Sequence, residues 1–422
     1  MTIVIKAARI FDGRSEGLLR NSSVVVEGDR IAGLIATART PSSAESIDLG
    51  DVTLSPGFID AHTHLTVAAE PYDQFFINLF RQHVAERAYL AARNARVTLE
   101  AGFTTVRDVG CIPGSNFVDV SLRNAIAKRL VAGPRMLVAR NLIGATGGHC
   151  DFTGGLSFRA TGRELDYTDG VADGPSALRQ AVRFNVKHGA DLIKFCASGG
   201  VLSLADEVDT PQLTLEEMTA VVDEAHRLRK RVAVHCHGDS AAKEAIVAGV
   251  ESIEHGSFLQ DDTLSAMKSK GTYLVPTLFA LEWLTGGRTR LPPAVKTKAL
   301  AAKASHSNVF RRAVELGVKI GYGTDASVFP HGLNAKDFAI MVRLGMSPAA
   351  ALRTATSVNA ELLGVENRLG TLEEGKVADV VAMPGDAIDD ITATEHVSFV
   401  MKEGIIVKSQ GDRFSIGRGR RT

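Results

Sequence analysis

A lysine stands inside an apolar stretch of the sequence. Residues 191–200 read DLIKFCASGG, in which Lys194 lies between Ile193 and Phe195. This pattern is typical of a buried strand that runs into a glycine turn. Burying an ammonium group costs free energy unless the charge is paired or chemically altered. Lys194 is therefore either half of a buried ion pair with an acidic residue or part of an active site.

Residues that can hold a metal follow several other apolar segments. They are His62 and His64 in one His-X-His motif, His235 and His237 in a second, His255, and Asp325. Both histidines of each motif lie on one face of a strand, because strand side chains alternate. A single strand histidine is more often a hydrogen-bonded core residue, and a Gly-Thr-Asp turn is more often a helix N-cap. Imidazoles and a carboxylate gathered together, in contrast, form a site for a metal such as zinc.

Eight β-rich segments, most of them separated by helical patterns, fill the middle of the chain. They lie at 57–65, 103–110, 135–140, 191–197, 231–238, 251–256, 272–278 and 319–325. This alternation predicts an α/β fold, a (β/α)8 TIM barrel, with an open doubly wound sheet as the main alternative. Catalytic groups of such barrels gather at the carboxyl ends of the strands. Lys194 and the metal-binding residues are therefore expected to meet at one mouth.

The two ends of the chain carry short β segments of similar character. IVIKAARI and SVVVEGDRIAGLI near the start are matched by GKVADVVAMPGD and FVMKEGIIVKSQGDR near the end. They predict a small β-sandwich domain built from residues 1–55 and 360–422. The barrel, over residues 56–359, is inserted between these two parts.

The composition excludes several classes of protein. Lys and Arg together number 48, as do Asp and Glu, so no global field favours nucleic acid or an anionic membrane as partner. No apolar run reaches the roughly 18 residues of a membrane helix, and the N-terminus does not resemble a signal peptide. A cytoplasmic location is expected. The four cysteines show no C-x-x-C spacing and are expected as reduced thiols.

The motifs PGFIDAHTH, HCHG, ESIEHG and GTD, together with the strand lysine, resemble the amidohydrolase superfamily of metal-dependent hydrolases. The resemblance extends over nearly the whole chain and includes GTLEEGKVADVVAM, which is similar to the family's return into its β-sandwich. It implies two divalent metal ions, with zinc expected. One ion is expected on His62, His64 and Asp325, and the other on His235 and His255. Lys194 is expected to bridge them as a carbamate formed with CO₂.

The same resemblance implies a mechanism. Two metal ions hold a hydroxide and polarise a carbonyl oxygen, and Asp325 accepts the proton and later delivers it to the leaving amine. A substrate contact is implied for His237. The glycine-rich loop 141–155 contains His149, which is similar to a residue that helps bind the scissile carbonyl in the prolidase-like branch. That branch cleaves dipeptides and N-acyl amino acids, and related members cut N-acyl-phenylalanine amides of the ochratoxin type.

The groups that contact the rest of the substrate are less well defined by the sequence. Arg107 and Arg140 are candidates for binding a substrate carboxylate, although surface ion pairs explain most such arginines. Trp283 is a candidate for an apolar pocket, although packing of its loop explains it equally well. A lactonase or phosphotriesterase, a deaminase of the same superfamily and a non-catalytic scaffold are the alternatives. A homo-oligomer is expected from the resemblance alone.

Overall fold

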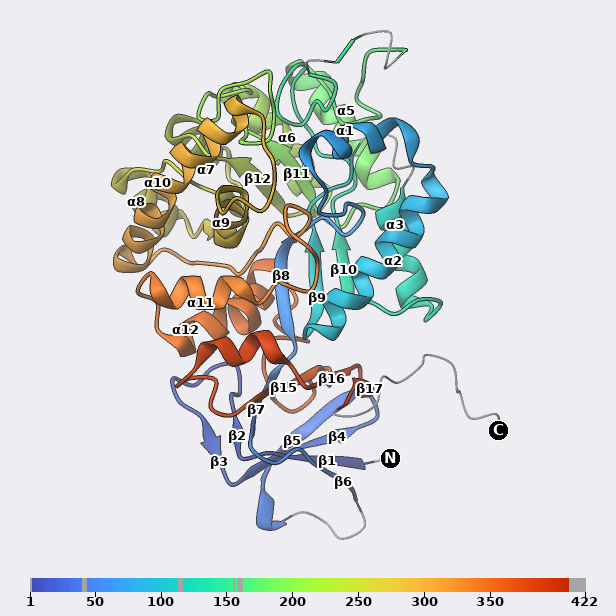
Figure 1. Ribbon diagram of the computed structural model, residues 1–422, viewed down its shortest axis with the longest axis vertical. Coiled ribbons are helices and arrows are strands. Elements are labelled where there is room, and N and C mark those ends of the chain that lie inside the picture. Colours follow the sequence, from blue (N-terminus) through green and yellow to red (C-terminus); the bar gives the residue numbers. More distant parts are fainter. Residues whose placement is uncertain (1, 40–43, 113–116, 155, 158–161, 410–422) are drawn as a thin grey trace.

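Parallel strands wrapped by helices form the larger part of the molecule, and a β domain lies below it (Figure 1). The computed structural model describes residues 2–39, 44–112, 117–154, 156–157 and 162–409. No helix in these ranges has the length and apolar character to cross a bilayer.

The parallel strands form two sheets. One has the order β10-β9-β8 and consists of β8 (Phe58–Thr63), β9 (Phe103–Asp108) and β10 (Arg135–Val138). The other runs β11-β12-β13-β14, with β11 (Ile193–Cys196), β12 (Val232–Cys236), β13 (Ser252–His255) and β14 (Tyr273–Val275). Single parallel bridges lie between the sheets at Ile143–Phe195, Leu274–Ile320 and Thr63–Ala326. Seven of the eight expected β segments therefore contain a strand.

The eighth expected segment, 319–325, is not a strand but makes backbone hydrogen bonds to strands on both sides. The N–H of Leu274 in β14 donates to the Lys319 carbonyl at 2.9 Å, and that of Ala61 in β8 donates to Tyr322 at 2.8 Å. Glycine lets this segment pass so closely, because a Cβ at Gly323 would lie 2.3 Å from a Val275 methyl carbon.

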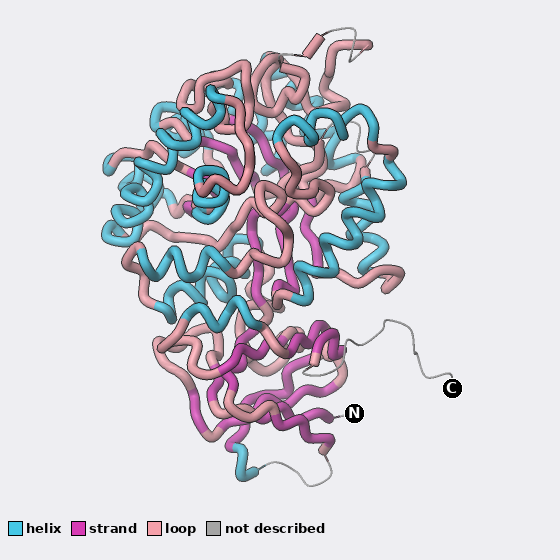
Figure 2. The backbone as a smooth tube through the Cα atoms, viewed as in Figure 1, coloured by secondary structure: helices cyan, strands magenta, loops and turns pink. Residues whose placement is uncertain are grey.

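Helices cover the outside of the parallel strands (Figure 2). The strand-connecting helices are α2 (Val84–Glu100), α3 (Val118–Ala127), α5 (Gly174–Lys187), α6 (Leu215–Arg227), α7 (Asp239–Ala248), α8 (Asp261–Lys270) and α10 (Pro293–Leu316). The last part of the barrel region adds α11 (Lys336–Arg343), α12 (Pro348–Arg353), η2 (Thr354–Val358) and α13 (Asn359–Leu363). Two further helices, α1 (Tyr72–Arg81) and α9 (Leu278–Thr285), follow the carboxyl ends of β8 and β14.

Local sequence explains where these helices begin, as α6 illustrates. Thr214 is its N-cap and forms a capping box with Glu217, whose carboxylate accepts the Thr214 N–H at 2.9 Å. Met218, Val221 and Ala225 are buried, as their helical spacing predicts.

Strands from both ends of the chain form two further sheets. A four-stranded sheet has the order β5-β4-β1-β6 and consists of β1 (Thr2–Lys6), β4 (Ser22–Glu27), β5 (Arg30–Ala36) and β6 (Glu45–Asp48). A six-stranded sheet runs β17-β16-β15-β7-β2-β3, with β2 (Arg9–Ile10), β3 (Leu19–Arg20), β7 (Val52–Pro56), β15 (Val380–Pro384), β16 (Phe399–Lys402) and β17 (Ile405–Lys408). The short helices η1 (Thr37–Arg39) and η3 (Ile391–His396) complete the described elements.

The chain returns to the β domain at β15. β7 and β15 pair antiparallel, with Pro56 opposite Val380, and one apolar cluster contains Leu54, Val380 and Phe399. Residue 360, the expected boundary, lies within α13, whose Leu362 packs in a cluster with Ile59 of β8. Residues 410–422 of the expected domain lie outside the described residues.

Candidate metal centre and active site

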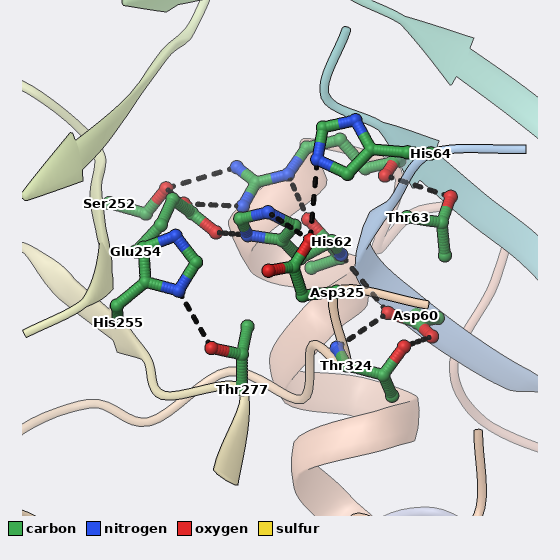
Figure 3. Close-up of polar contacts among 12 residues, drawn as sticks. Asp60, His62, Thr63, His64, Ser252, Glu254, His255, Thr277, Thr324 and Asp325 are labelled. Atoms are coloured by element: carbon green, nitrogen blue, oxygen red, sulfur yellow. Dashed lines mark hydrogen bonds and ion pairs between the residues drawn. The ribbon is translucent and has the colours of Figure 1, made fainter. Parts of the chain in front are cut away.

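Four of the residues expected to bind metal, His62, His64, His255 and Asp325, lie close together near the carboxyl ends of the parallel strands (Figure 3). His62, His64 and Asp325 form one group that could hold a cation, and His235, His237 and His255 form a second. The Nε2 atoms of His62 and His64 lie 3.6 and 3.4 Å from Oδ1 of Asp325. The His62 and His255 rings, one from each group, have centroids 5.0 Å apart. The two groups are therefore adjacent.

Hydrogen bonds fix the ring nitrogen that each histidine of the first group offers. Nδ1 of His62 lies 2.7 Å from Oε2 of Glu254, and Nδ1 of His64 lies 2.7 Å from the Gly110 carbonyl oxygen. A carboxylate and a carbonyl only accept, so both Nδ1 atoms carry the proton. Each Nε2 is left with a lone pair beside Asp325, which is the form that binds a metal.

The second group is prepared in a similar way. Nε2 of His235 lies 3.0 Å from the Gly199 carbonyl oxygen, so Nδ1 of His235 carries the lone pair. Nδ1 of His255 bonds to the Thr277 hydroxyl at 2.7 Å, and the His235 and His255 rings are 4.7 Å apart. Both histidines thus have one nitrogen without a described protein partner.

His237 lies in the same group. Its Nδ1 bonds to the Ser257 hydroxyl at 2.9 Å, and its ring stacks on His255 with centroids 4.9 Å apart. The His237 and His235 rings lie at similar distances from the His255 ring, 4.9 and 4.7 Å between centroids. These distances therefore do not distinguish which histidine of the motif is the metal ligand.

Two of the candidate ligands have unusual backbones. His255 and Asp325 adopt left-handed conformations, with φ of 70° and 60°. A non-glycine residue in this region costs on the order of 1 kcal/mol and is found mostly where function requires it. His255 ends β13, Asp325 ends the irregular segment 319–325, and each belongs to one of the two groups.

Lys194 is buried between the two groups. Its side chain is 1% exposed and lines the same cavity as the histidines. Among the described residues the Lys194 ammonium makes no hydrogen bond or ion pair. The structure therefore does not contain the buried ion pair that was the alternative for Lys194. Burial lowers the pKa of Lys194 to about 8, against the opposing fields of Glu254 and Asp325. A lysine with a lowered pKa has a larger fraction of neutral amine at physiological pH than an exposed lysine has.

Burial also controls the charge of the surrounding groups. It lowers the pKa of His62 to about 4 and that of His237 to about 3, so both rings are neutral at physiological pH. Burial alone would raise the pKa of Asp325, but His62 and His64 hold it well below its usual range. The site therefore combines neutral imidazoles at His62 and His237 with an ionised carboxylate, whose charge and hydrogen bond raise the pKa of His64 against the effect of burial. Imidazoles and a carboxylate are a donor set that suits zinc, manganese or cobalt.

A cavity of about 230 Å³ opens above these groups. Its lining includes His149 and two apolar walls. One wall is aromatic and is formed by Tyr72, Phe75, Phe76 and Phe152; the other is aliphatic and includes Val201, Leu202, Leu281, Leu284 and Leu291.

Arg107 does not line the cavity. Its guanidinium is buried, donates to Oε1 of Glu254 at 2.7 Å, and also bonds to Ser252 and to the carbonyl of Ala61. The sequence placed Arg107 near the correct strand end but could not show that its side chain points into the strand layer.

Arg140 and Trp283 are also absent from the cavity lining. The Arg140 guanidinium is buried and lies 3.7 Å from the centre of the Phe117 ring. Trp283 packs edge-on against Phe279, while its neighbours Leu281 and Leu284 reach the cavity instead. The structure therefore does not bring Arg107, Arg140 or Trp283 to the place where a substrate would lie.

The expectation of four reduced cysteines is corrected by the structure. Cys150 and Cys196 form a disulfide with Cα atoms 6.2 Å apart, while Cys111 and Cys236 are buried and lie outside this bond. Loop 141–155 is brought against β11 by backbone bonds, since the Cys196 N–H donates to the Ile143 carbonyl at 2.9 Å. The two cysteines are 46 residues apart in sequence, a spacing that carries no local signal.

Comparison with known proteins agrees with this site. Residues 53–408 match the model of the amidohydrolase family. The chain is 31% identical over 437 aligned residues to the ochratoxinase of Aspergillus niger, with 97% of this chain and 87% of that protein covered.

Two solved structures are similar over nearly the whole chain. A Xaa-Pro dipeptidase with methionine bound in its active site has a TM-score of 0.91 and 39% identity, covering 97% of this chain and 100% of that one. A prolidase complexed with N-methylphosphonate-L-proline has a TM-score of 0.86 and 30% identity, with the same coverage. The chain belongs to the amidohydrolase family and is a metal-dependent hydrolase of amide bonds.

Proposed function

We propose that the protein hydrolyses the amide bond of dipeptides or N-acyl amino acids and releases a C-terminal amino acid. One observation carries this proposal: two groups of metal-binding residues flank a buried, unpaired lysine at the base of a cavity. Similarity to an ochratoxinase and to a Xaa-Pro dipeptidase supports an amide substrate. N-acyl-phenylalanine amides, including ochratoxin A, are included among the substrates that we propose.

Each ligand has a proposed place. His62, His64 and Asp325 would hold one divalent ion, and His235 and His255 would hold the other. Zinc matches this N/O donor chemistry. Lys194, as a carbamate formed with CO₂, would bridge the two. Bound there, the ions would polarise a substrate carbonyl and lower the pKa of a water molecule to about 7.

The protein's own groups then carry the proton. Asp325 is ionised, so it can accept the proton that leaves the attacking water and pass it to the departing nitrogen. The acyl carbon gains the hydroxyl and loses the nitrogen, and the amine leaves with the proton. His237 lies beside His255 and would contact the substrate.

The surroundings of the site complete the proposal. We propose that the two parallel sheets and segment 319–326 close into one (β/α)8 barrel, supported by backbone bonds of that segment to both β14 and β8. The aromatic and aliphatic walls favour a substrate with a large apolar group. The barrel over 56–359 and the β-sandwich from the two ends would be separate domains.

Amino-acid release from a panel of substrates tests the function. The panel should contain dipeptides and N-acyl amino acids with C-terminal proline, basic and aromatic residues, and the enzyme should be loaded with zinc. Release of a free amino acid is the expected result. If the loaded enzyme releases none, the proposal fails, and lactones and phosphoesters, which the same kind of metal centre can cleave, should be assayed next.

A further inference from the structure

The loop between β11 and α6 supplies part of the aliphatic wall of the cavity. Val201, Leu202 and Leu204 of this loop line the cavity, and the Leu204 side chain is half exposed. The base of the loop is closed by an antiparallel bridge between Ser198 and Pro211. The wall is therefore formed here by the tip of a loop, and contacts from other elements must hold that tip in place.

Lys298 of α10 holds the loop tip from outside the cavity. Its ammonium donates to the carbonyl oxygens of Gly200 and Ser203, both at 3.0 Å, and to Oδ1 of Asp206 at 2.9 Å. An ammonium group has three N–H bonds, so these three acceptors use all of them. The Lys298 side chain is only 11% exposed and does not line the cavity. Any effect of Lys298 on a substrate must therefore pass through the loop.

Two further contacts join the same loop tip to the rest of the cavity. The Tyr72 hydroxyl of α1 donates to the Leu202 carbonyl oxygen at 2.8 Å, so the aromatic wall is bonded to the aliphatic wall. Val201 packs in one apolar cluster with Leu281 of α9 and Ala302 of α10. Both walls of the cavity therefore depend on the position of this loop tip.

Removing the Lys298 ammonium would leave acceptors of the loop without a donor. Asp206 would still accept from the Gln212 amide, at 2.8 Å to Oδ2. Within the described ranges, however, no other donor reaches the Ser203 carbonyl oxygen. An acceptor that loses its partner in a part-buried place costs free energy unless the backbone moves to let water reach it. The loop tip would therefore move away from its present position.

We infer that Lys298 is a positioning residue that fixes the loop tip 200–206 and thereby sets how the cavity selects the apolar group of its substrate. Its three hydrogen bonds hold the backbone that carries Val201, Leu202 and Leu204. The selectivity part of this inference rests on the proposed function, whereas the anchoring of the loop does not.

Hydrogen exchange tests the anchoring without a substrate. In zinc-loaded full-length protein, we expect Lys298→Met to make peptides from 198–212 exchange about tenfold faster, as read by mass spectrometry. Lys298→Arg keeps the charge but offers at most two N–H bonds on one nitrogen, so it should give a smaller change in the same direction.

The control for this measurement is Lys402→Met. Lys402 is equally buried, with 12% of its side chain exposed, but it lies in β16 of the β domain beside Glu403. It should leave the exchange of the loop unchanged. Wild-type exchange of the loop in both Lys298 variants, or an equal acceleration in Lys402→Met, would overturn the anchoring role.

Steady-state kinetics test the selectivity. We expect Lys298→Met to raise KM about tenfold for substrates with a large apolar group, with kcat within about twofold of the wild type and metal content unchanged. KM for alanine-containing substrates should change little. An unchanged ratio of the two KM values, or an equal loss of kcat for all substrates, would overturn the selectivity role. Absence of amide hydrolysis in the wild type would refute the proposed function, while hydrogen exchange would still decide whether Lys298 holds the loop.

Discussion

Oε2 of Glu254 lies 2.7 Å from Nδ1 of His62, and neither side chain is exposed by more than 1%. The other oxygen of Glu254 accepts from Arg107 at 2.7 Å and from Ser252 at 2.5 Å. Arg107 and His62 hold the pKa of Glu254 down to about 2, although burial alone would raise it. Glu254 is therefore an ionised carboxylate that orients His62 and increases its basicity toward a metal.

Replacing Glu254 with glutamine should weaken metal binding. We expect Glu254→Gln to reduce zinc affinity by about 10- to 100-fold, because the neutral amide no longer polarises the His62 ring. Competition with a chelator measures this affinity. Glu251→Gln is the control, since Glu251 contacts His226 on the surface at 3.1 Å and is outside both metal-binding groups. Equal affinities of Glu254→Gln and the wild type would contradict the role of Glu254.

Removing Arg107 should destabilise the fold rather than weaken substrate binding. Arg107→Met leaves the Glu254 charge buried beside a single histidine, which costs about 3–5 kcal/mol in the free energy of unfolding. Chemical unfolding of the metal-free variant measures the loss. Arg183→Met, which breaks an ion pair of a largely exposed arginine with Glu224, should change the free energy of unfolding far less, because exposed ion pairs contribute little. If Arg107→Met has the unfolding free energy of the wild type but a raised KM, Arg107 binds the substrate and the structural role is wrong.

Lys194→Ala should abolish activity. Without the proposed carbamate, we expect kcat/KM to fall by at least about 10³-fold, or about 4 kcal/mol, and the metal content to fall with it. A small added carboxylate such as acetate should restore part of both. His226→Ala should be silent, because His226 is exposed and pairs only with Glu251 among the described residues. Full activity of Lys194→Ala with one metal bound would exclude the two-metal proposal.

The aromatic wall should affect substrate choice. We expect Phe75→Ala to raise KM about tenfold for substrates with a large apolar group and to change it little for alanine-containing ones, because about 1–2 kcal/mol of apolar contact is lost. Steady-state kinetics on paired substrates measure the difference. Trp283→Ala, which removes an aromatic ring that does not line the cavity, should not change this preference. The same selectivity loss in both variants would show that the wall is not specific.

The disulfide should be detectable and should stabilise the protein. Alkylation of the unfolded protein before reduction should label two cysteines, and after reduction four, as counted by intact mass. A bridge that closes a loop of about 46 residues is worth about 4 kcal/mol, so Cys150→Ala should lower the unfolding temperature by several degrees. Cys236→Ala is the control for loss of a buried thiol outside the disulfide. Labelling of all four cysteines before reduction would contradict the bridge.

Much of the site could be predicted from the sequence, because its ligands end strands. His62, His255 and Asp325 lie at or near the ends of apolar β segments, Lys194 lies within one, and parallel strands bring such ends to one place. The supporting residues were harder to predict. Glu254 lies in the segment ESIEHG, inside a buried strand. A buried carboxylate requires a cationic or N–H partner, so this residue type was a signal that such a partner lies beside it.

Other features depend on contacts that a linear pattern does not contain. A strand period separates two faces but does not say which arginine lies in the strand layer and which reaches the cavity, so Arg107 and Arg140 were both plausible. The Cys150–Cys196 bond joins segments 46 residues apart. The expected strand at 319–325 has the right composition, but its glycines lie so close to β8 and β14 that it forms a single bridge instead.

The pairing of β7 with β15 has a consequence for biosynthesis. During synthesis, β7 (Val52–Pro56) leaves the ribosome more than 300 residues before β15 (Val380–Pro384), the strand with which it pairs. Until then an edge of the six-stranded sheet is unpaired, and open strand edges promote aggregation. Translation arrested shortly before β15 should therefore release chains that can form the parallel-strand region but require chaperones to stay in solution.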